Sequence, residues 1–397
     1  MTALPLNRLS VARSRVVVPP LDWVLVGCAA LIMTMGTLLV WSATATNDVL
    51  TGGDSTAYLH KHLVNVVIGL VLAAVVMATD HRWVRIVTPL VYAGSVIGLL
   101  LVLVMGTTIN GSRSWLMIGG LSIQPAEFAK LAVVIGMAMI VAERTENSRQ
   151  RRVGLVDVAL MGAVAGLPAV LIMAQPDLGT MLVLTATVFG VLAVAGVPRR
   201  WLVGLLASGV ALVTLVVAAG VLKSYQVNRF IAFIYPDLDP RGAGYNTTQA
   251  RIAIGNGGLF GQGLFDGSQT RSRFVPEQHT DFIFTVAGEE LGLVGAGLLI
   301  VLFAVLLWRA LLIARHAEDM FGRGAAAGIA CWFAFQAFQN IGMCLGIMPV
   351  TGVPLPLVSY GGSSMFATMM AIGLLVNIGM RGTGTGRPGF GVRPRGR

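Results

Sequence analysis

Long apolar stretches, separated by short polar connections, occupy almost the whole chain. A transmembrane helix needs about 20 mostly apolar residues, with a usual range of about 17 to 25. Stretches of roughly this length can be marked at residues 23–42, 63–79, 86–105, 126–142, 158–174, 179–197, 201–222, 281–308, 325–347 and 364–380. They do not alternate between polar and apolar positions as the strands of a membrane barrel do. The pattern therefore predicts an all-α polytopic membrane protein with about ten transmembrane helices.

Composition and charge support this prediction. The chain is 55% hydrophobic and only 12% charged, whereas a typical soluble protein is roughly 25% charged. The net charge of +10 does not indicate nucleic acid, because the basic residues gather in connections on one side: "DHRWVR", "ERTENSRQRR", "PRR" and "RHAEDMFGR". The short loops on the other side hold only Lys61 and Arg113. By the positive-inside rule, the basic connections and both termini are expected to be cytoplasmic.

A single transmembrane domain is expected over residues 20–380. Basic cytoplasmic tails are expected at 1–19 and 381–397, and an extracytoplasmic loop at about 223–280. This loop is rich in glycine but also carries aromatic and aliphatic residues, so we expect it to be ordered over the outer face. The first apolar stretch is long enough to remain as a span, so no cleavable signal peptide is expected.

Three carboxylates, those of Asp281, Glu289 and Glu290, lie at the start of the eighth stretch. A carboxylate inside a bilayer is costly unless it is paired, protonated or in contact with water. As one continuous helix, the segment from Asp281 to Arg315 would run about 52 Å, well beyond a hydrocarbon core of about 30 Å. Its first turns are therefore expected near the outer headgroups or along a cavity. Thr280 or Asp281 also suits a helix N-cap, whereas Glu289 and Glu290 lie too deep for capping and need a basic partner, such as an arginine of the long loop, or water.

Two further motifs place acidic and basic residues near the outer ends of predicted helices. "QPAEFAK" contains Gln124, Glu127 and Lys130, and "AQPDLGT" contains Asp177. One interpretation is a helix start with an intrahelical Glu–Lys pair and an Asp cap. The other is a functional site, because ionisable residues within membrane segments are costly and usually have a role.

The long loop and the segment before the last stretch complete the set of polar motifs. The loop supplies Arg229, Arg241, Arg251 and several glycines, which is a weak signal for phosphate binding. The segment "PVTGVPLPLVSYGGSS" predicts irregular backbone beside protein or a water-filled cavity. The residues alone thus leave three classes open: an enzyme acting on a lipid head group, a transporter, and a membrane scaffold.

Five separated motifs together resemble the SEDS family (shape, elongation, division and sporulation), which includes RodA and FtsW. These are "QPAEFAK", "QPDLGT", "GYNTTQARIAIGNGGLFGQG", "FVPEQHTDFIFTVAGEELGLVG" and "PVTGVPLPLVSYGGSS", in the order of the family's own motifs. The resemblance covers roughly residues 20 to 380 and is closer to the RodA branch. Asn256 departs from the family pattern, which often has Ser there, so no chemical role is assigned to that position.

The resemblance implies a peptidoglycan glycosyltransferase that polymerises lipid II at the outer face of the bacterial cytoplasmic membrane, during elongation and shape maintenance. The catalytic Asp of the family's "HTDF" motif corresponds to Asp281, expected to act as a general base. Lys130 and Arg229 are expected to hold pyrophosphate, with Glu127 orienting Lys130. Further substrate contacts are expected from Trp115, Arg113, Gln124, Asp177 and Ser359, although an interfacial tryptophan belt also explains Trp115. Structural support is expected from Glu289, Glu290, Gly257, Gly258, Pro354 and Gly361.

The resemblance also implies partners. These are lipid II and its undecaprenyl-type carrier, a class B penicillin-binding protein, and other membrane proteins of the elongation machinery. A divalent cation, Mg²⁺ or Mn²⁺, shared between Asp281 and a substrate phosphate is an alternative source of positive charge. Two rival functions stay open: a lipid II flippase, and a non-catalytic scaffold for a penicillin-binding protein in elongation or division.

Overall fold

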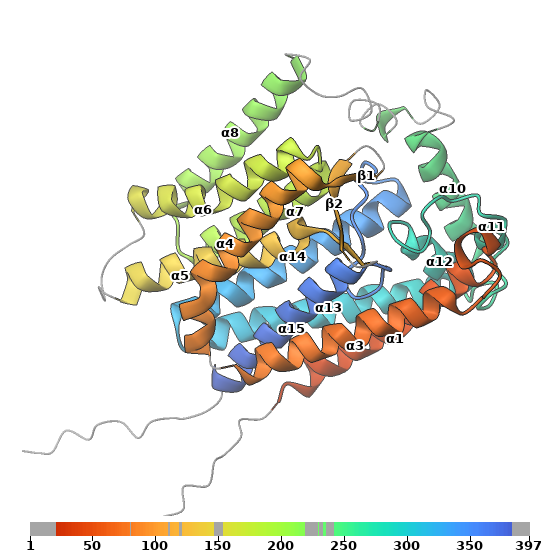
Figure 1. Ribbon diagram of the computed structural model, residues 1–397, viewed down its shortest axis with the longest axis horizontal. Coiled ribbons are helices and arrows are strands. Elements are labelled where there is room, and N and C mark those ends of the chain that lie inside the picture. The colour runs from red at the N-terminus through yellow and green to blue at the C-terminus, as the bar shows by residue number, and fades with distance from the viewer. Residues whose placement is uncertain are drawn as a thin grey trace, which may run out of the picture.

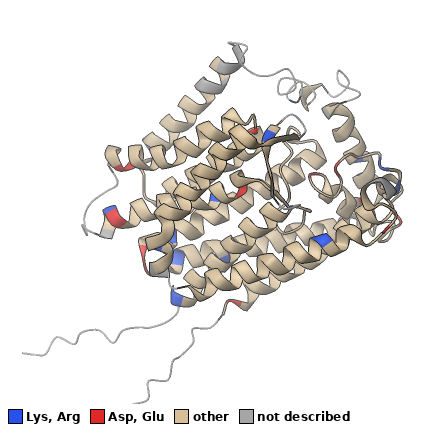
Figure 2. Cartoon of the chain, viewed as in Figure 1, with Lys and Arg blue, Asp and Glu red and all other residues tan. Residues whose placement is uncertain are grey.

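The computed structural model describes most of the chain as helices that run between two ends of the molecule (Figure 1). The described residues are 21–79, 81–109, 112–118, 121–146, 154–218, 229, 233–235 and 242–382. The predicted tails at 1–19 and beyond Gly382 lie outside them, as does Arg241. The start of α1 and the end of α15 lie at the same end of the molecule (Figure 1), and charged residues gather mainly near helix ends and in loops (Figure 2).

The helices match the predicted apolar stretches in order. The long ones are α1 (Trp23–Ala45), α3 (Ala57–Ala78), α4 (His81–Met105), α5 (Pro125–Glu146), α6 (Leu155–Ala174), α7 (Leu178–Val194), α8 (Arg199–Ala218), α13 (Gly292–His316), α14 (Met320–Leu345) and α15 (Gly362–Gly382). Short helices are α2 (Asp48–Thr51), α10 (Ala243–Asn256), α11 (Ser268–Ser272) and α12 (Ile283–Glu290). Within the described residues, seven helices are long and apolar enough to cross a membrane. The shorter α7, together with α8 and α14, accounts for the other predicted stretches, and the count of about ten spans stays a prediction.

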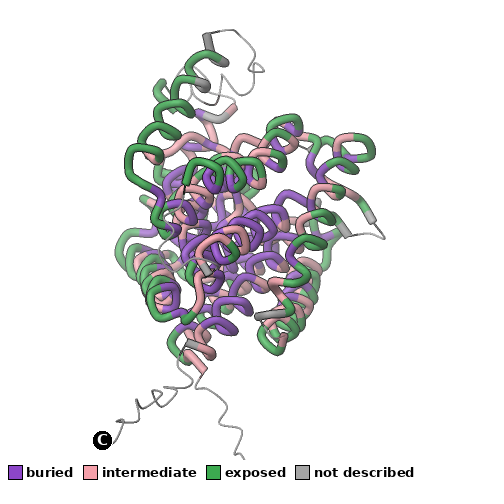
Figure 3. Tube along the Cα trace, turned by 90° about the vertical axis from the view of Figure 1, so that its left-hand side faces the viewer, coloured by how far each residue is buried: buried purple, intermediate pink, exposed green. Residues whose placement is uncertain are grey.

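The helices divide into a buried centre and an exposed periphery (Figure 3). In α5 and α15, 83% and 78% of the most apolar window is buried inside the protein, against 22% in α3 and in α4. The outward faces of α3 and α4 carry large apolar side chains, including Val67, Val71, Ile86 and Leu90. Apolar side chains exposed in this way on long helices are expected to face lipid.

A small antiparallel sheet departs from the all-α prediction. Strands β1 (Thr107–Ile109), β2 (Ser112–Ile118) and β3 (Leu121–Ile123) pair in the order β1-β2-β3 between α4 and α5. Their Thr, Ile and Trp residues favour extended backbone. Ser363 of α15 connects the sheet to this helix. Its Oγ accepts from the Gln124 N–H at 2.9 Å and donates to the Ser122 carbonyl at 3.3 Å.

The eighth apolar stretch, marked at 281–308, is divided in the structure, because the chain breaks between α12 and α13. Gly292 has φ +66°, and a Cβ there would lie 2.3 Å from the Gly261 nitrogen. Glycine is favoured at positive φ because it carries no Cβ. The loop packs into this break: Leu293 N–H donates to the Gly258 carbonyl at 2.9 Å, and Gln262 N–H donates to the Glu289 carbonyl at 3.0 Å. The membrane-length helix therefore begins at Gly292, and Asp281 lies in the turn that precedes α12.

Candidate active site

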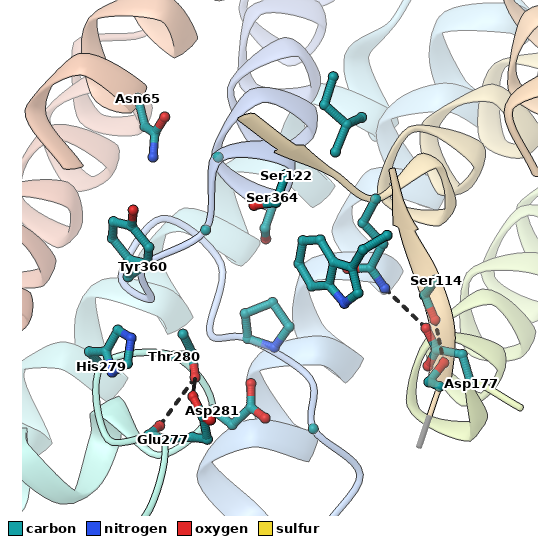
Figure 4. A pocket seen from close by; sticks show the side chains of 18 of the residues that line it. Asn65, Ser114, Ser122, Asp177, Glu277, His279, Thr280, Asp281, Tyr360 and Ser364 are labelled. Carbon is teal, nitrogen blue, oxygen red and sulfur yellow. Dashed lines mark hydrogen bonds between the residues drawn. The ribbon is translucent and has the colours of Figure 1, made fainter. Parts of the chain in front are cut away.

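A cavity of about 630 Å³ opens beside Asp281 (Figure 4). Its walls come from α3, the sheet, the turns before α5 and α7, the turn at 277–281, and the segment leading into α15. The lining includes His60, Lys61, Asn65, Ser114, Trp115, Ser122, Gln124, Asp177, Arg229, Glu277, His279, Thr280, Asp281, Thr351, Gly352, Pro354, Tyr360, Gly361 and Ser364. Residues far apart in the sequence thus form one cavity with both polar and apolar walls.

Asp281 is held on a tight turn with its carboxylate pointing into the cavity (Figure 4). The N–H groups of Thr280, Asp281 and Phe282 donate to the Glu277 carbonyl at 3.2, 3.1 and 3.2 Å. The residue that caps α12 is Phe282, which makes no side-chain cap hydrogen bond. The capping interpretation of Asp281 is therefore wrong, and its carboxylate is available to the cavity.

The surroundings of Asp281 favour its protonated form more than water does. The pKa of its carboxyl is raised to about 7, chiefly by burial and then by the negative charge of Glu277, while the charge of Arg229 lowers it. A carboxylate with a pKa near neutrality is well matched to accepting a proton under physiological conditions.

Gly352 forms the wall directly behind the Asp281 carboxylate. Its φ is +72°, and a Cβ built on it would lie 3.3 Å from Asp281 Oδ2. A side chain at position 352 would be strained and would press against the carboxylate. The segment 351–354 therefore approaches Asp281 through bare backbone.

An aromatic cluster forms a second wall, and the sequence analysis did not identify it. The ring centroids of Tyr58 and His279 lie 5.3 Å apart, those of Tyr58 and Tyr360 lie 5.0 Å apart, and Lys61 Nζ lies 5.0 Å from the Tyr58 centroid. The Tyr360 N–H donates to the His279 carbonyl at 2.9 Å. Burial lowers the pKa of His279, so its ring is expected to be neutral at pH 7. The position of His279 two residues before Asp281 was the available sequence signal.

Gln124, Asp177 and Trp115 line a further wall, as predicted for substrate-contacting residues. Asp177 is also the N-cap of α7, since its Oδ1 accepts from the Thr180 N–H at 3.0 Å. Its Oδ2 accepts from Gln124 Nε2 at 3.1 Å. Burial raises the pKa of Asp177. Asp177 therefore caps a helix and lines the cavity at the same time.

Lys130 lies in the core and is absent from the cavity lining. Its Nζ donates to Glu127 Oε1 at 2.7 Å and to Gln336 Oε1 at 2.8 Å, and lies 4.9 Å from the ring centroid of Trp332. The Glu127–Lys130 pair forms as expected, and both side chains are buried. The position of Lys130 does not support the predicted direct contact with pyrophosphate, because its ammonium is enclosed by these partners.

Arg113 and Ser359 also lie away from the cavity lining. Arg113 donates to the Val104 and Gly106 carbonyls at the end of α4, at 2.7 and 2.8 Å. Ser359 Oγ accepts from the Leu355 N–H at 2.8 Å and is buried. Their positions support a role in local structure in place of the predicted substrate contact, whereas Arg229 does line the cavity.

Glu289 and Glu290 have no arginine partner among the described residues, and an arginine partner from the long loop stays a prediction. Glu289 accepts four hydrogen bonds: from the N–H groups of Gln269 and Thr270 at 2.7 and 2.9 Å, and from the hydroxyls of Thr270 and Ser268 at 2.7 and 3.3 Å. Glu290 accepts from the Ser42 hydroxyl at 2.7 Å. Backbone and hydroxyl donors at α11, and the Ser42 hydroxyl on α1, are thus the partners of these two carboxylates.

Glycines of the loop allow it to pack against these acids. A Cβ on Gly257 would lie 1.9 Å from the Gly288 carbonyl oxygen, and Gly258 has φ +54°. Both positions need glycine, which fits the structural role predicted for them. Pro354 and Gly361, also predicted as support, line the cavity, and the Pro354 carbonyl accepts from Gln336 Nε2 at 2.8 Å.

The described residues contain no cluster of three or more His, Cys, Asp or Glu side chains able to hold a metal ion. Asp281 and Glu277 are the acidic side chains of one turn, and Asp177 lies on another wall (Figure 4). Mg²⁺ prefers six oxygen ligands and keeps several waters. A cation here would therefore need oxygens from a substrate phosphate, and the shared-ion prediction stays a prediction.

Comparison with known sequences gives a consistent set of relatives. A family model described as cell cycle protein, covering FtsW, RodA and SpoVE, matches residues 22–383. The chain is 38% identical to a probable peptidoglycan glycosyltransferase FtsW of Aeromonas salmonicida, over 90% of each chain. It is 38% identical to stage V sporulation protein E of Bacillus subtilis, over 90% of this chain and 96% of that one. It is 35% identical to peptidoglycan glycosyltransferase MrdB of Escherichia coli, over 87% and 90%.

Solved structures agree with these relatives. A chain from a peptidoglycan synthase complex, in a study of how polymerization and crosslinking are coordinated, matches with a TM-score of 0.77 and 33% identity, over 91% of this chain and 98% of that one. The rod shape determining protein RodA of Thermus thermophilus matches with a TM-score of 0.66 and 31% identity, over 90% and 96%. Because relatives from several branches match over similar lengths, the nearness to the RodA branch stays a prediction.

Proposed function

The chain belongs to the FtsW/RodA/SpoVE family of cell cycle proteins, and from this premise we propose that it is a peptidoglycan glycosyltransferase that polymerises lipid II. The observation that carries the proposal is the Asp281 carboxylate, which points into the cavity with a pKa of about 7. Relatives named peptidoglycan glycosyltransferase and the match to a chain of a peptidoglycan synthase complex support the assignment.

Asp281 acts as the general base in this proposal. A sugar hydroxyl of one lipid II attacks the anomeric carbon of another chain and passes its proton to the Asp281 carboxylate as the new C–O bond forms. The bond to the lipid pyrophosphate breaks, and the pyrophosphate leaves with the bonding electrons. A single base with in-line displacement inverts the configuration at the anomeric carbon.

The leaving pyrophosphate needs positive charge nearby. Arg229 lines the same cavity as Asp281 and lowers the pKa of Asp281 through its charge. It is therefore the side chain best placed to stabilise the departing anion. A Mg²⁺ or Mn²⁺ ion shared with the substrate phosphate would supply further positive charge.

The aromatic and polar walls suit the rest of the substrate. Trp115, Tyr360 and His279 present ring surfaces, and Gln124, Asn65 and Asp177 present hydrogen-bonding groups. Apolar helices that flank the cavity suit an undecaprenyl-type chain in the bilayer. In this proposal the cavity opens at the outer face of the bacterial cytoplasmic membrane, and the uneven distribution of the basic connections supports that orientation.

A class B penicillin-binding protein is the proposed partner, with elongation and shape maintenance as the proposed process. The match to a chain of a peptidoglycan synthase complex supports such a partner. Crosslinking would then be the partner's reaction, while this chain supplies the glycan strand. Other membrane proteins of the elongation machinery are expected to join the same assembly.

The test is lipid II polymerisation by the purified protein with its penicillin-binding partner, whose own activity is blocked by a β-lactam. The parent is compared with Asp281→Asn, each with and without a divalent-metal chelator. Glycan chains from the parent alone support the proposal, and their loss with chelator supports the shared cation. Chains from both proteins would assign the chemistry to another residue. Chains from neither, with folded protein and bound partner confirmed, would contradict the enzyme and favour the flippase or scaffold.

A further inference from the structure

Helix α14 carries three buried amide side chains on one face, and none of them was assigned a role by the sequence. Gln336, Gln339 and Asn340 follow the i, i+3, i+4 spacing that places residues on one side of a helix. All three are fully buried. A membrane-length helix with three amides is costly unless each amide has partners. Their partners show what this face does.

All three amide nitrogens donate to the segment that forms the wall behind Asp281. Gln336 Nε2 donates to the Pro354 carbonyl at 2.8 Å. Gln339 Nε2 donates to the Pro349 carbonyl at 3.2 Å and to the Thr351 hydroxyl at 3.1 Å. This face of α14 therefore holds the segment 349–354 by its backbone.

Asn340 differs from the other two amides because it also holds the residue that carries the carboxylate. Its Nδ2 donates to the main-chain carbonyl of Asp281 and to the carbonyl of Val353, both at 2.7 Å. An amide NH₂ has two hydrogens, so both are used. One side chain thus joins the Asp281 main chain to the wall next to Gly352.

We propose that Asn340 is a positioning residue for Asp281, which fixes the separation between the Asp281 carboxylate and the backbone at Gly352. The inference rests on the proposed function, since it concerns how the general base is held. A Cβ at position 352 would lie only 3.3 Å from Asp281 Oδ2, so a small relative shift of the two segments changes the space around the carboxylate. Misplacement of a reacting group by about 1 Å can cost on the order of a hundredfold in rate.

The amide group of Gln336, on the same face of α14, has a fixed orientation. Its Oε1 accepts from Lys130 Nζ at 2.8 Å and from Trp332 Nε1 at 2.6 Å. With both donors on the oxygen, the nitrogen must point to Pro354. The buried Lys130 thereby contributes to the cavity wall through Gln336.

The test uses two matched asparagines. Asn340→Leu keeps a similar side-chain shape and removes both donors. Asn377→Leu makes the same change on α15 in another part of the molecule, where Asn377 is similarly buried and its Nδ2 lies within hydrogen-bond distance of the Val76, Met77 and Thr79 carbonyls. Both variants lose a comparable buried hydrogen-bonding group, but only Asn340 contacts Asp281.

Lipid II polymerisation is measured per folded, partner-bound protein, with kcat and KM separated and folding checked by size-exclusion chromatography. We expect Asn340→Leu to lower kcat by about 10- to 100-fold with KM within about twofold, and Asn377→Leu to keep both near the parent values. Equal kcat losses in the two variants would overturn the proposal, because they would show a general packing effect. So would an unchanged kcat in Asn340→Leu.

A second measurement covers the case in which Asn340→Leu does not fold. Asn340→Ser retains one donor, and we expect an intermediate loss of kcat. Asp281→Glu is then combined with Asn340→Ser and, as a control, with Asn377→Leu. The longer carboxylate should fit better once the main chain is released. The fold-loss of kcat in Asp281→Glu with Asn340→Ser should therefore be smaller than the product of the two single fold-losses. In the control pair it should equal that product. Fold-losses of kcat that simply multiply in both pairs would overturn the proposal. A parent that makes no glycan chains would instead contradict the proposed function.

Discussion

Asp281 and Glu289 lie in the same short segment, yet the structure treats their carboxylates in opposite ways. Glu289 accepts four hydrogen bonds from α11 and is completely buried. No side-chain hydrogen bond to Asp281 is seen among the described residues, and its carboxylate faces a cavity. A carboxylate saturated with donors stabilises structure, whereas one with few donors and a raised pKa is suited to proton transfer.

The largest expected effect comes from removing the cavity carboxylate. Asp281→Asn keeps the size of the side chain and removes the base, so polymerisation should fall by about 10²- to 10⁴-fold. Folding and partner binding should be retained, because the hydrogen bonds of Asp281 to Glu277 and Asn340 are made by its main chain. Thermal unfolding in detergent and co-purification with the partner provide the control. A polymerisation rate of Asp281→Asn within about twofold of the parent rate would contradict a catalytic role for the Asp281 carboxylate.

Removing the buried carboxylate should lower the stability of the protein and leave the polymerisation rate unchanged. Glu289→Gln brings an NH₂ group against N–H and O–H donors that the carboxylate now satisfies, and unfolding should be easier by about 3 kcal/mol. The apparent melting temperature measures this loss. Polymerisation per folded molecule should stay near the parent rate. A large loss of kcat in well-folded Glu289→Gln protein would contradict a purely structural Glu289.

The glycine loop that covers Glu289 permits a finer test of the same region. Gly257→Ala would place a Cβ 1.9 Å from the Gly288 carbonyl oxygen, so the loop must shift at a cost of about 1–3 kcal/mol. Gly255→Ala is the matched control, since a Cβ there meets nothing within 4 Å. We expect the control to change the stability by less than about 0.5 kcal/mol. Equal melting temperatures for the two variants would show that the loop does not pack tightly on α12.

The smallest expected effect concerns pH. Only deprotonated Asp281 can accept a proton, so the polymerisation rate should rise with pH through about 7, the pKa of its carboxyl. The Glu277 charge raises this pKa, so Glu277→Gln should lower it and move the rising limb to lower pH. Rate profiles of both proteins between pH 5 and 9 measure the shift. A move to higher pH would contradict the assigned interaction.

Much of the helical arrangement could be predicted because membrane-length apolar runs leave few alternatives to helices. The prediction was weakest where polar residues begin a helix. The predicted stretch at 63–79 is α3 in the structure, which begins at Ala57, and its first turns carry Tyr58, Lys61 and His62, which lowered the apolar signal. The break at Gly292 was missed because the apolar run continues across it without a change in composition.

For the candidate site, the outcome depended on the kind of partner each residue has. Asp281, Gln124, Asp177, Trp115 and Arg229 all line the cavity, and their roles toward a substrate stay predictions. Outer-end motifs that flank apolar runs gave the signal for these residues. Amides such as Asn340 gave none, because Asn or Gln in an apolar helix has the same sequence signature whether it caps, packs or holds a catalytic turn.

The sequence by itself determined the long apolar helices, the polar motifs between them and the family, because local apolar length and motif order are properties of the chain. Tertiary structure decided which carboxylate is open to the cavity. It also enclosed Lys130 away from the cavity and set Asn340 against Asp281. The physical reason is that the hydrogen-bond partners of a buried group come from segments distant in the sequence: Glu289 accepts from α11, Lys130 donates to Gln336, and the Asp281 main-chain carbonyl accepts from Asn340 on α14. Only folding brings each donor within about 3 Å of its acceptor.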